Sequence, residues 1–181
     1  LIKDVANIEN VQVILDVGAN VGFFSMLCRE LYPDSKIYAF EPVPKTFTCL
    51  KKNFKDDRSI VVNNVAILDS VGKAKMDFED QNPAGASIKV DGAVEVSVNT
   101  LDSYCDNNKI KYIDILKIDV ETSETFVLQG AQKILSITKY IYIEILIENN
   151  RNFTISQLFK LLYSEKFNFQ ILGIRNFTDS G

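Results

Sequence analysis

The chain has 181 residues, of which 46% are apolar and 24% charged, and its 20 basic and 24 acidic side chains give a net charge of −4. This length and composition predict one folded domain over residues 1–181, and because the chain begins with Leu1 rather than Met, it can be part of a longer protein. The basic residues are scattered, which argues against nucleic acid as a partner, and no apolar run approaches the roughly 20 residues of a membrane span.

The chain contains no histidine. A Ser-His-Asp triad, a Cys-His pair and a histidine-ligated metal are therefore excluded within these residues. The three cysteines, Cys28, Cys49 and Cys105, lie far apart and lack C-x-x-C spacing. We expect reduced, mostly buried thiols rather than disulfides or a zinc site. The first residues lack the long apolar segment of a signal peptide, and we expect a cytoplasmic location.

Strands and helices alternate over the first 65 residues. Short apolar runs that end in turn residues predict buried parallel strands, and the segments between them carry helix signals such as Pro44 at a first turn. In chain order we predict a strand over 13–17, a helix over 22–31, a strand over 36–40, a helix over 44–54 and a strand over 60–65.

The pattern changes from residue 72 onward. The runs "GKAKMDFED" and "AVEVSVNTL" alternate apolar and polar residues, which predicts exposed antiparallel strands in an inserted hairpin or edge ribbon over 72–98. Between these runs, the small residues of "NPAGAS", 82–87, predict a mobile loop. Our hypothesis is that this loop folds over a bound cofactor or acceptor.

The second half of the chain returns to alternating strands and helices. Thr100 is the expected N-cap of a short helix, "YIDILKIDV" is a fourth core strand and "KYIYIEILI" a fifth. Between these strands, "SETFVLQGAQKIL" predicts one helix with apolar residues near helical spacing, namely Phe126, Val127, Ala131 and Ile134. A helix in "TISQLFKLLYSE" and a strand in "FNFQILGI" complete an α/β fold with a doubly wound, mostly parallel sheet and an inserted β-hairpin.

The stretch "ILDVGANVGFFS" joins the first strand to the first helix. Gly18 allows a tight turn, and Gly22 allows the helix to pack closely on the strand. The spacing is G-x-x-x-G rather than the G-x-G-x-x-G of dinucleotide enzymes, and a carboxylate at Asp16 would repel a pyrophosphate. A ligand with a cationic amine and no phosphate, such as S-adenosylmethionine, fits both observations. The alternative is an ordinary turn in which Asp16 caps the backbone. The predicted contacts at the turn are Asp16, Gly18, Ala19, Asn20, Gly22 and Phe23.

The second and third strands supply further candidates at the same edge of the sheet. Glu41 ends the second strand in "YAFEPVP". An acid about 20 residues after the glycine turn accepts hydrogen bonds from ribose hydroxyls in nucleoside-binding sheets. A carboxylate suits a cis-diol because its two oxygens accept both hydroxyls. We therefore predict ribose contacts from Glu41 and Pro42, and adenine contacts, mostly through the backbone, from Asn64, Val65 and Ala66.

Four segments in this order, "ILDVGANVGFFS", "FEPVP", "VNTLDSY" and "ILKIDVETSETFVLQGA", resemble the FkbM family of S-adenosylmethionine-dependent methyltransferases. The resemblance runs from about Val13 to Glu148. It implies a Rossmann-like class I methyltransferase fold and methyl transfer, usually to a hydroxyl oxygen of a sugar, a glycolipid or another natural product.

Individual residues match the family pattern, and one departs from it. Asp16, Gly18, Asn20 and Gly22 match the cofactor turn, Glu41 matches the ribose acid, and Lys117, Asp119 and Glu121 match the segment K-I-D-V/I-E-G. Thr122 stands where glycine is usual, which implies an altered loop after the fourth strand. The last antiparallel strand of the usual seven-stranded sheet is not evident in the sequence.

Methyl transfer to a hydroxyl requires in-line alignment and can use a base that accepts the hydroxyl proton. Without histidine the candidate bases are carboxylates: Asp119 first, then Glu121 or Glu144, the last within the fifth strand near its end. These acids could instead hold a divalent cation or only hydrogen-bond a sugar, and Glu121 could simply favour a helix dipole. No metal ligand is predicted. Lys117 is expected to snorkel or to pair with an acid rather than to catalyse.

Three functions are compatible with these patterns. The leading one is S-adenosylmethionine-dependent O-methylation of a hydroxyl on a sugar, glycan or other small natural product. The second is a nicotinamide-dependent oxidoreductase, against which Asp16 and the missing third glycine argue. The third is a non-catalytic nucleoside-binding module, for which Thr122 and the absence of histidine leave room. The acceptor, a metal requirement and the oligomeric state are not indicated.

Overall fold

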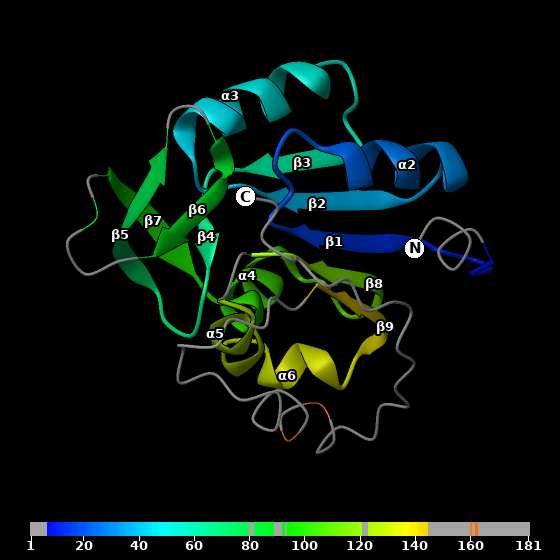
Figure 1. The fold of residues 1–181 in the computed structure, drawn as a ribbon. Coiled ribbons are helices and arrows are strands. Elements are labelled where there is room, and N and C mark those ends of the chain that lie inside the picture. Colours follow the sequence, from blue (N-terminus) through cyan, green and yellow to red (C-terminus); the bar gives the residue numbers. More distant parts are fainter. Residues whose placement is uncertain are drawn as a thin grey trace, which may run out of the picture.

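A computed structural model describes residues 7–79, 82–88, 92, 94–120, 123–144, 160 and 162. Its centre is a five-stranded parallel sheet in the order β3-β2-β1-β8-β9 (Figure 1). These strands are β1 (Val13–Val17), β2 (Lys36–Phe40), β3 (Ile60–Asn63), β8 (Ile113–Ile118) and β9 (Thr138–Ile143). The order reverses beside β1, as in a doubly wound sheet, which confirms the predicted fold class.

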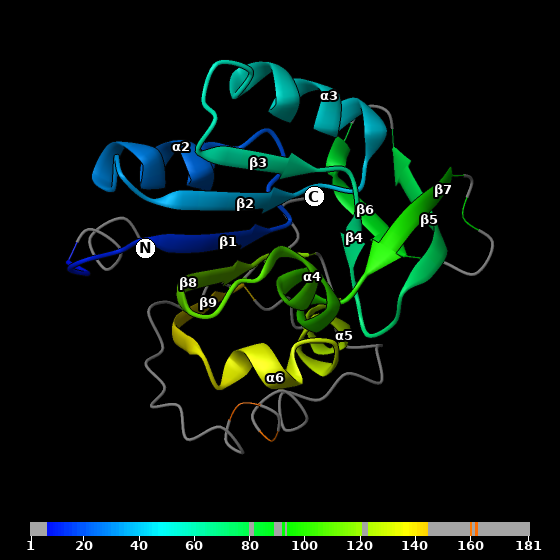
Figure 2. The same ribbon diagram turned by 180° about the vertical axis from the view of Figure 1, so that it is seen from behind.

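Helices cover both faces of this sheet, as Figures 1 and 2 show. They are α2 (Phe23–Leu31), α3 (Pro44–Asn53), α4 (Leu101–Asn108), α5 (Glu124–Gln129) and α6 (Gln132–Leu135). Successive strand residues face opposite sides. Ile14 packs with Phe24 and Cys28 of α2, whereas Leu15 belongs to the core that includes Leu101 of α4 and residues of α5 and α6.

Local signals explain where several of these elements begin. Pro44 occupies the first turn of α3, and the Thr100 side chain accepts a hydrogen bond from the Ser103 amide at the start of α4. Cys28 and Cys105 are buried free thiols and Cys49 is an exposed one. Burial raises the pKa of Cys28 and of Cys105 to about 12, so both thiols stay protonated at neutral pH.

A second, four-stranded sheet in the order β4-β7-β5-β6 stands beside the carboxyl ends of the central strands (Figures 1 and 2). Its strands are β4 (Ala66–Ile67), β5 (Gly72–Glu79), β6 (Asn82–Ile88) and β7 (Val94–Asn99). The predicted ribbon is therefore present, but the predicted mobile loop over 82–87 is wrong. That segment is the edge strand β6, which pairs antiparallel with β5 along one side.

The single helix predicted from Ser123 to Leu135 is interrupted between α5 and α6. At Gly130 an added Cβ would lie 2.0 Å from the carbonyl oxygen of Leu68, so the chain passes very close to the second sheet there. The Asp102 carboxylate, from α4, accepts hydrogen bonds from two amides at the start of α6. Within the interrupted helix, Phe126 is 50% exposed rather than buried.

Two further expectations concern the end of the chain. The fifth strand, β9, ends at Ile143, so Glu144 directly follows the strand instead of lying within it. The predicted last strand in "FNFQILGI" lies outside the described residues, and so does all of the preceding helix except two positions.

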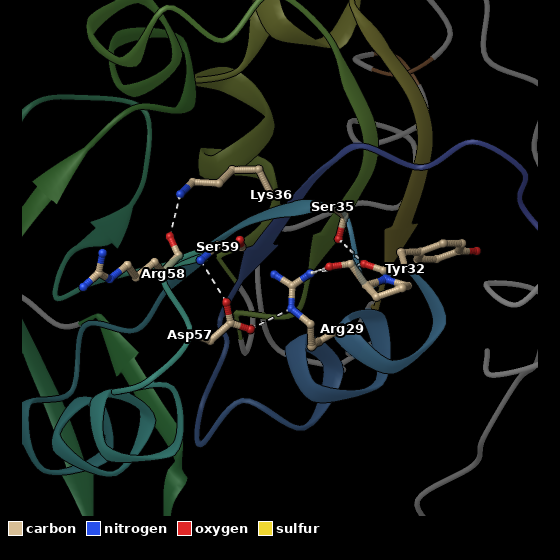
Figure 3. Close-up of polar contacts among 8 residues, drawn as sticks. Arg29, Tyr32, Ser35, Lys36, Asp57, Arg58 and Ser59 are labelled. Atoms are coloured by element: carbon tan, nitrogen blue, oxygen red, sulfur yellow. Dashed lines mark hydrogen bonds and ion pairs between the residues drawn. The ribbon is translucent and has the colours of Figure 1, made fainter.

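The amino ends of β2 and β3 are tied to α2 by a polar cluster centred on Arg29 (Figure 3). Arg29 Nε donates to Asp57 Oδ2 at 2.7 Å, and its Nη1 donates to the carbonyl oxygens of Tyr32 and Pro33. Asp57 also accepts from the Ser59 amide at 2.8 Å. The Arg29 and Asp57 side chains are 20% and 31% exposed, so this ion pair is only partly screened by water.

We expect Arg29→Met to lower the free energy of unfolding by about 1–3 kcal/mol, because it leaves partly buried oxygen atoms without their donor. Lys133→Met is the matched control, since the Lys133–Asp106 pair is 73% and 64% exposed. Such a pair contributes within about 0.5 kcal/mol. Urea unfolding of both variants measures the difference, and equal losses would contradict this assignment.

Candidate active site

A cavity of about 220 Å³ lies at the carboxyl ends of β1, β2 and β8, where the second sheet approaches the first. Ligands bind at this edge of open α/β sheets, beside the strand where the order reverses. The lining residues come from six parts of the chain: Val17, Gly18, Asn20, Phe40, Glu41, Pro42, Val43, Val65, Ala66, Ile67, Leu68, Met76, Asp119, Val120, Ser123 and Glu144.

The glycine turn forms one side of this cavity. Gly18 has a φ of 76°, and a Cβ there would lie 1.8 Å from the carbonyl oxygen of Asp119, so only glycine fits. The amides of Gly18 and Ala19 both donate to the carbonyl oxygen of Phe40, at 3.1 and 2.9 Å. These amides are therefore not available to cradle a phosphate, which is what dinucleotide-binding turns do.

Glu41 lies at the tip of β2, is 6% exposed and lines the cavity. Its Oε2 accepts from the Asn20 amide at 3.0 Å, and its Oε1 accepts from the Val43 amide at 2.8 Å. The two bonds hold both carboxylate oxygens in place. Each oxygen still has lone pairs for a hydroxyl donor.

The environment of Glu41 also changes its acidity. Burial raises the pKa of Glu41 above its usual 4.5, and the charge of Asp16 adds to this effect. The amides of Val43 and Asn20 and the charge of Lys117 act in the opposite direction and only partly offset it. A ligand whose hydroxyls donate to the carboxylate would favour the charged form.

Asp16 is fully buried behind the turn. Its Oδ2 accepts from Ser25 Oγ of α2 at 2.7 Å, and its Oδ1 lies 3.3 Å from Lys117 Nζ. Lys117 thus pairs with an acid, as predicted. Asp16 does not line the cavity, so its predicted contact with a ligand ammonium stays a prediction.

Acidic side chains also follow β8 and β9. Asp119, directly after β8, has a side chain 34% exposed, with Oδ2 3.2 Å from Lys117 Nζ. Glu144 follows β9 and is exposed, and its amide donates to the carbonyl oxygen of Ile118 at 3.0 Å. Both residues line the same cavity. Glu121 and Thr122 lie outside the described residues.

The structure brings many predicted residues together but not all of them. The predicted residues that line the cavity are Gly18, Asn20, Glu41, Pro42, Val65, Ala66, Asp119 and Glu144. Those that do not are Asp16, Ala19, Gly22, Phe23 and Asn64. Phe23, at the start of α2, is 77% exposed. The Asn64 side-chain amide donates to the carbonyl oxygens of Glu41 and Pro42, so Asn64 supports the Glu41 segment.

Sequence reasoning missed the apolar wall of the cavity. Ile67 and Leu68 come from β4 and the residue after it, and Met76 comes from β5 of the second sheet. All three are at most 9% exposed. The alternating pattern of β5 could have marked Met76 as inward-facing, but nothing local indicated that its sheet meets the first one.

Metal-binding clusters and membrane-spanning helices are both absent from the described part of the chain. Among these residues no group of three or more acidic or cysteine side chains is placed to hold a metal ion. Within the same residues, none of the helices has the length and hydropathy of a membrane span.

Comparison with known proteins places this site in a family. Residues 16–171 match the family described as "Methyltransferase FkbM domain". The chain is 27% identical to the 2-O-methyltransferase NoeI of Sinorhizobium fredii, with 73% of the chain and 62% of the relative covered. It is 29% identical to the 31-O-demethyl-FK506 methyltransferase FkbM of Streptomyces tacrolimicus (66% and 59% covered). It is 26% identical to the hexuronic acid methyltransferase AglP of Haloferax volcanii (76% and 57% covered). The chain thus spans about three fifths of the length of these curated relatives.

A solved structure supports the same fold. The precorrin-6y C5,15-methyltransferase of Geobacter metallireducens superposes with a TM-score of 0.55 at 11% identity, over 91% of this chain and 68% of the other. This likeness establishes the fold alone, whereas the family match covers most of the sequence. The chain belongs to the FkbM methyltransferase family.

Proposed function

We propose that this chain is an S-adenosylmethionine-dependent O-methyltransferase acting on a hydroxyl of a sugar, glycan or other small natural product. The observation that carries the proposal is the buried Glu41 carboxylate, held by the Asn20 and Val43 amides beside a turn whose own amides are already bonded to Phe40. That arrangement provides hydrogen-bond acceptors for the two hydroxyls of a diol, whereas the Gly18 and Ala19 amides are not free to bind a phosphate.

The described residues fit this cofactor. Glu41 would accept the ribose hydroxyls, and the apolar wall of Ile67, Leu68 and Met76 would contact an uncharged flat group such as adenine. Asp119 and Glu144 place negative charge in the cavity at the ends of β8 and β9, which suits a cationic sulfonium amino acid. A nicotinamide dinucleotide fits less well, because its pyrophosphate would face carboxylates and the Gly18 and Ala19 amides are already bonded to Phe40.

Only a few side chains are placed to take part in the methyl transfer. When bound, S-adenosylmethionine supplies an electrophilic methyl group. Asp119 is the first candidate to accept the hydroxyl proton of the acceptor, with Glu144 as the second, because both line the cavity and are accessible. The residues of the other walls would bind and orient the cofactor and the acceptor, since transfer requires the acceptor oxygen to lie in line with the methyl group.

The acceptor class is inferred from chemistry and from relatives. Carboxylates such as Asp119 and Glu144 can also accept hydrogen bonds from the hydroxyls of a sugar. One relative is named for 2-O-methylation and another for a hexuronic acid. A hydroxylated carbohydrate-like acceptor is consistent with both.

We expect wild-type protein to bind S-adenosylhomocysteine, the demethylated cofactor, and Glu41→Gln to weaken binding by roughly 1–3 kcal/mol, because one acceptor oxygen is lost. Isothermal titration calorimetry measures both affinities. Glu30→Gln, an exposed acid on α2, is the matched control and should bind as the wild type does. No heat from well-folded wild-type protein would overturn the proposed function.

The affinity should also depend on pH through Glu41. Because burial raises its pKa and the ligand favours the charged form, affinity is full above that raised pKa and falls as the pH drops through it. The fall should therefore begin at a higher pH than for an ordinary glutamate. Calorimetry from pH 8 down to about 5 tests this, and Glu41→Gln should lose this part of the dependence. The same curve in both proteins would contradict the role of Glu41.

We expect Asp119→Asn to reduce methyl transfer by about 10²–10⁴-fold if Asp119 accepts the proton. Its affinity for S-adenosylhomocysteine should change much less. Transfer from labelled cofactor to a panel of hydroxylated glycans measures the rate, and Glu144→Gln in parallel tests the second candidate. Equal losses of rate and affinity would point to a structural role for Asp119, and binding without transfer to any acceptor would favour a non-catalytic module.

A further inference from the structure

Lys117 is the penultimate residue of β8, with a side chain only 12% exposed. Its Nζ donates to the carbonyl oxygen of Gly18 at 2.8 Å and lies 3.3 Å from Asp16 Oδ1 and 3.2 Å from Asp119 Oδ2. An ammonium has three N–H donors. The three oxygens come from three separate places: the turn, β1 and the residue after β8.

Such a buried charge is costly unless it is fully paired. Burial by itself would lower the pKa of Lys117, but the charges and hydrogen bonds of Asp16 and Asp119 outweigh it and raise the pKa above the usual 10.5. Lys117 therefore stays charged at neutral pH. It does not line the cavity, so its effect on a ligand must pass through the groups it holds.

Those groups form two walls of the cavity that touch each other. A Cβ on Gly18 would lie 1.8 Å from the Asp119 carbonyl oxygen, and the Asp119 amide donates to the Val17 carbonyl oxygen at 3.1 Å. The backbone thus places the turn against the Asp119 segment. Lys117 adds the bond that joins the Gly18 carbonyl to the Asp119 carboxylate.

We propose that Lys117 is a positioning residue of the cofactor site, which fixes the glycine turn through the Gly18 carbonyl and links the turn to Asp119. As far as it concerns the cofactor, this inference rests on the proposed function. The simpler role is that of a counter-ion, in which Lys117 only neutralises the buried Asp16 carboxylate.

The double variant Asp16→Asn with Lys117→Met separates the two roles. It removes the buried carboxylate and the ammonium together, so no charge at Asp16 is left unpaired, and an asparagine can still accept from Ser25. It also keeps the protein testable where Lys117→Met alone fails to fold. A counter-ion role predicts that the glycine turn of the double variant is as stable as that of the wild type, whereas the positioning role predicts a loosened turn.

The first measurement is amide hydrogen exchange without ligand. The Gly18 and Ala19 amides, which donate to the Phe40 carbonyl oxygen, should exchange at least about tenfold faster in the double variant. Amides of α4, far from the turn in sequence, should be unchanged. Wild-type exchange at Gly18 and Ala19 would overturn the proposal, and so would a uniform increase across the chain.

The second measurement is calorimetry with S-adenosylhomocysteine, for which the double variant should bind about tenfold more weakly than Asp16→Asn alone, because that single variant keeps the bonds of Lys117 to Gly18 and Asp119. Lys36→Met is the matched control, because it removes a lysine from β2 at the opposite end of the same sheet. Equal affinity of the double variant and of Asp16→Asn would contradict the positioning role. Should the wild type itself bind nothing, the proposed function fails, and the exchange comparison still decides the role of Lys117.

Discussion

The buried ammonium of Lys117 connects two central strands of the sheet, β1 and β8, with the site at their carboxyl ends. Asp16 of β1 and Lys117 of β8 are direct neighbours in the sheet register, so opposite charges meet across parallel strands in the interior. The Ser25 hydroxyl extends this contact to α2, and the Gly18 carbonyl extends it to the turn. A pair of this kind contributes little net stability after desolvation, but breaking it is costly, so its main effect is to specify one arrangement of strand, turn and helix.

The turn that results differs in function from a phosphate-binding loop, although both join a first strand to a first helix. Gly18 and Ala19 direct their amides at the Phe40 carbonyl oxygen at the end of β2, within the protein itself. The neighbouring amides of Asn20 and Val43 are directed at Glu41 instead. Donors that could have met a phosphate are thereby used to hold a carboxylate in place. The local backbone thus places a buried carboxylate where a phosphate-binding loop presents free amides, which favours hydroxyl and cationic groups over anions.

Residue patterns predicted the parts of this fold that depend on short-range signals. The limits of β1 and β2 follow from apolar runs closed by turn residues, and the start of α4 follows from Thr100. The break after α5 was not predictable, because the Asp102 carboxylate that binds the start of α6 lies about 30 positions away in the sequence. Strand β6 was missed because its small residues resemble a loop and only pairing with β5 makes it a strand. At the site, spacing identified Glu41, whereas the burial of Asp16 depends on contacts with Ser25 and Lys117 that no spacing reveals.

The second sheet gives the cavity a chemical asymmetry that the parallel sheet alone would lack. The strand tips of the first sheet carry carboxylates, whereas the residues facing them from β4 and β5, Ile67 and Met76, are apolar. This asymmetry suits a ligand that is polar and hydroxylated at one end and flat and uncharged at the other, as the proposed nucleoside is. At about 220 Å³ the cavity is smaller than the roughly 300–1,000 Å³ of typical ligand pockets, so its described walls enclose only part of a cofactor and its acceptor. Acceptor selectivity is therefore expected to depend on Asp119 and Glu144, which line the cavity and are accessible.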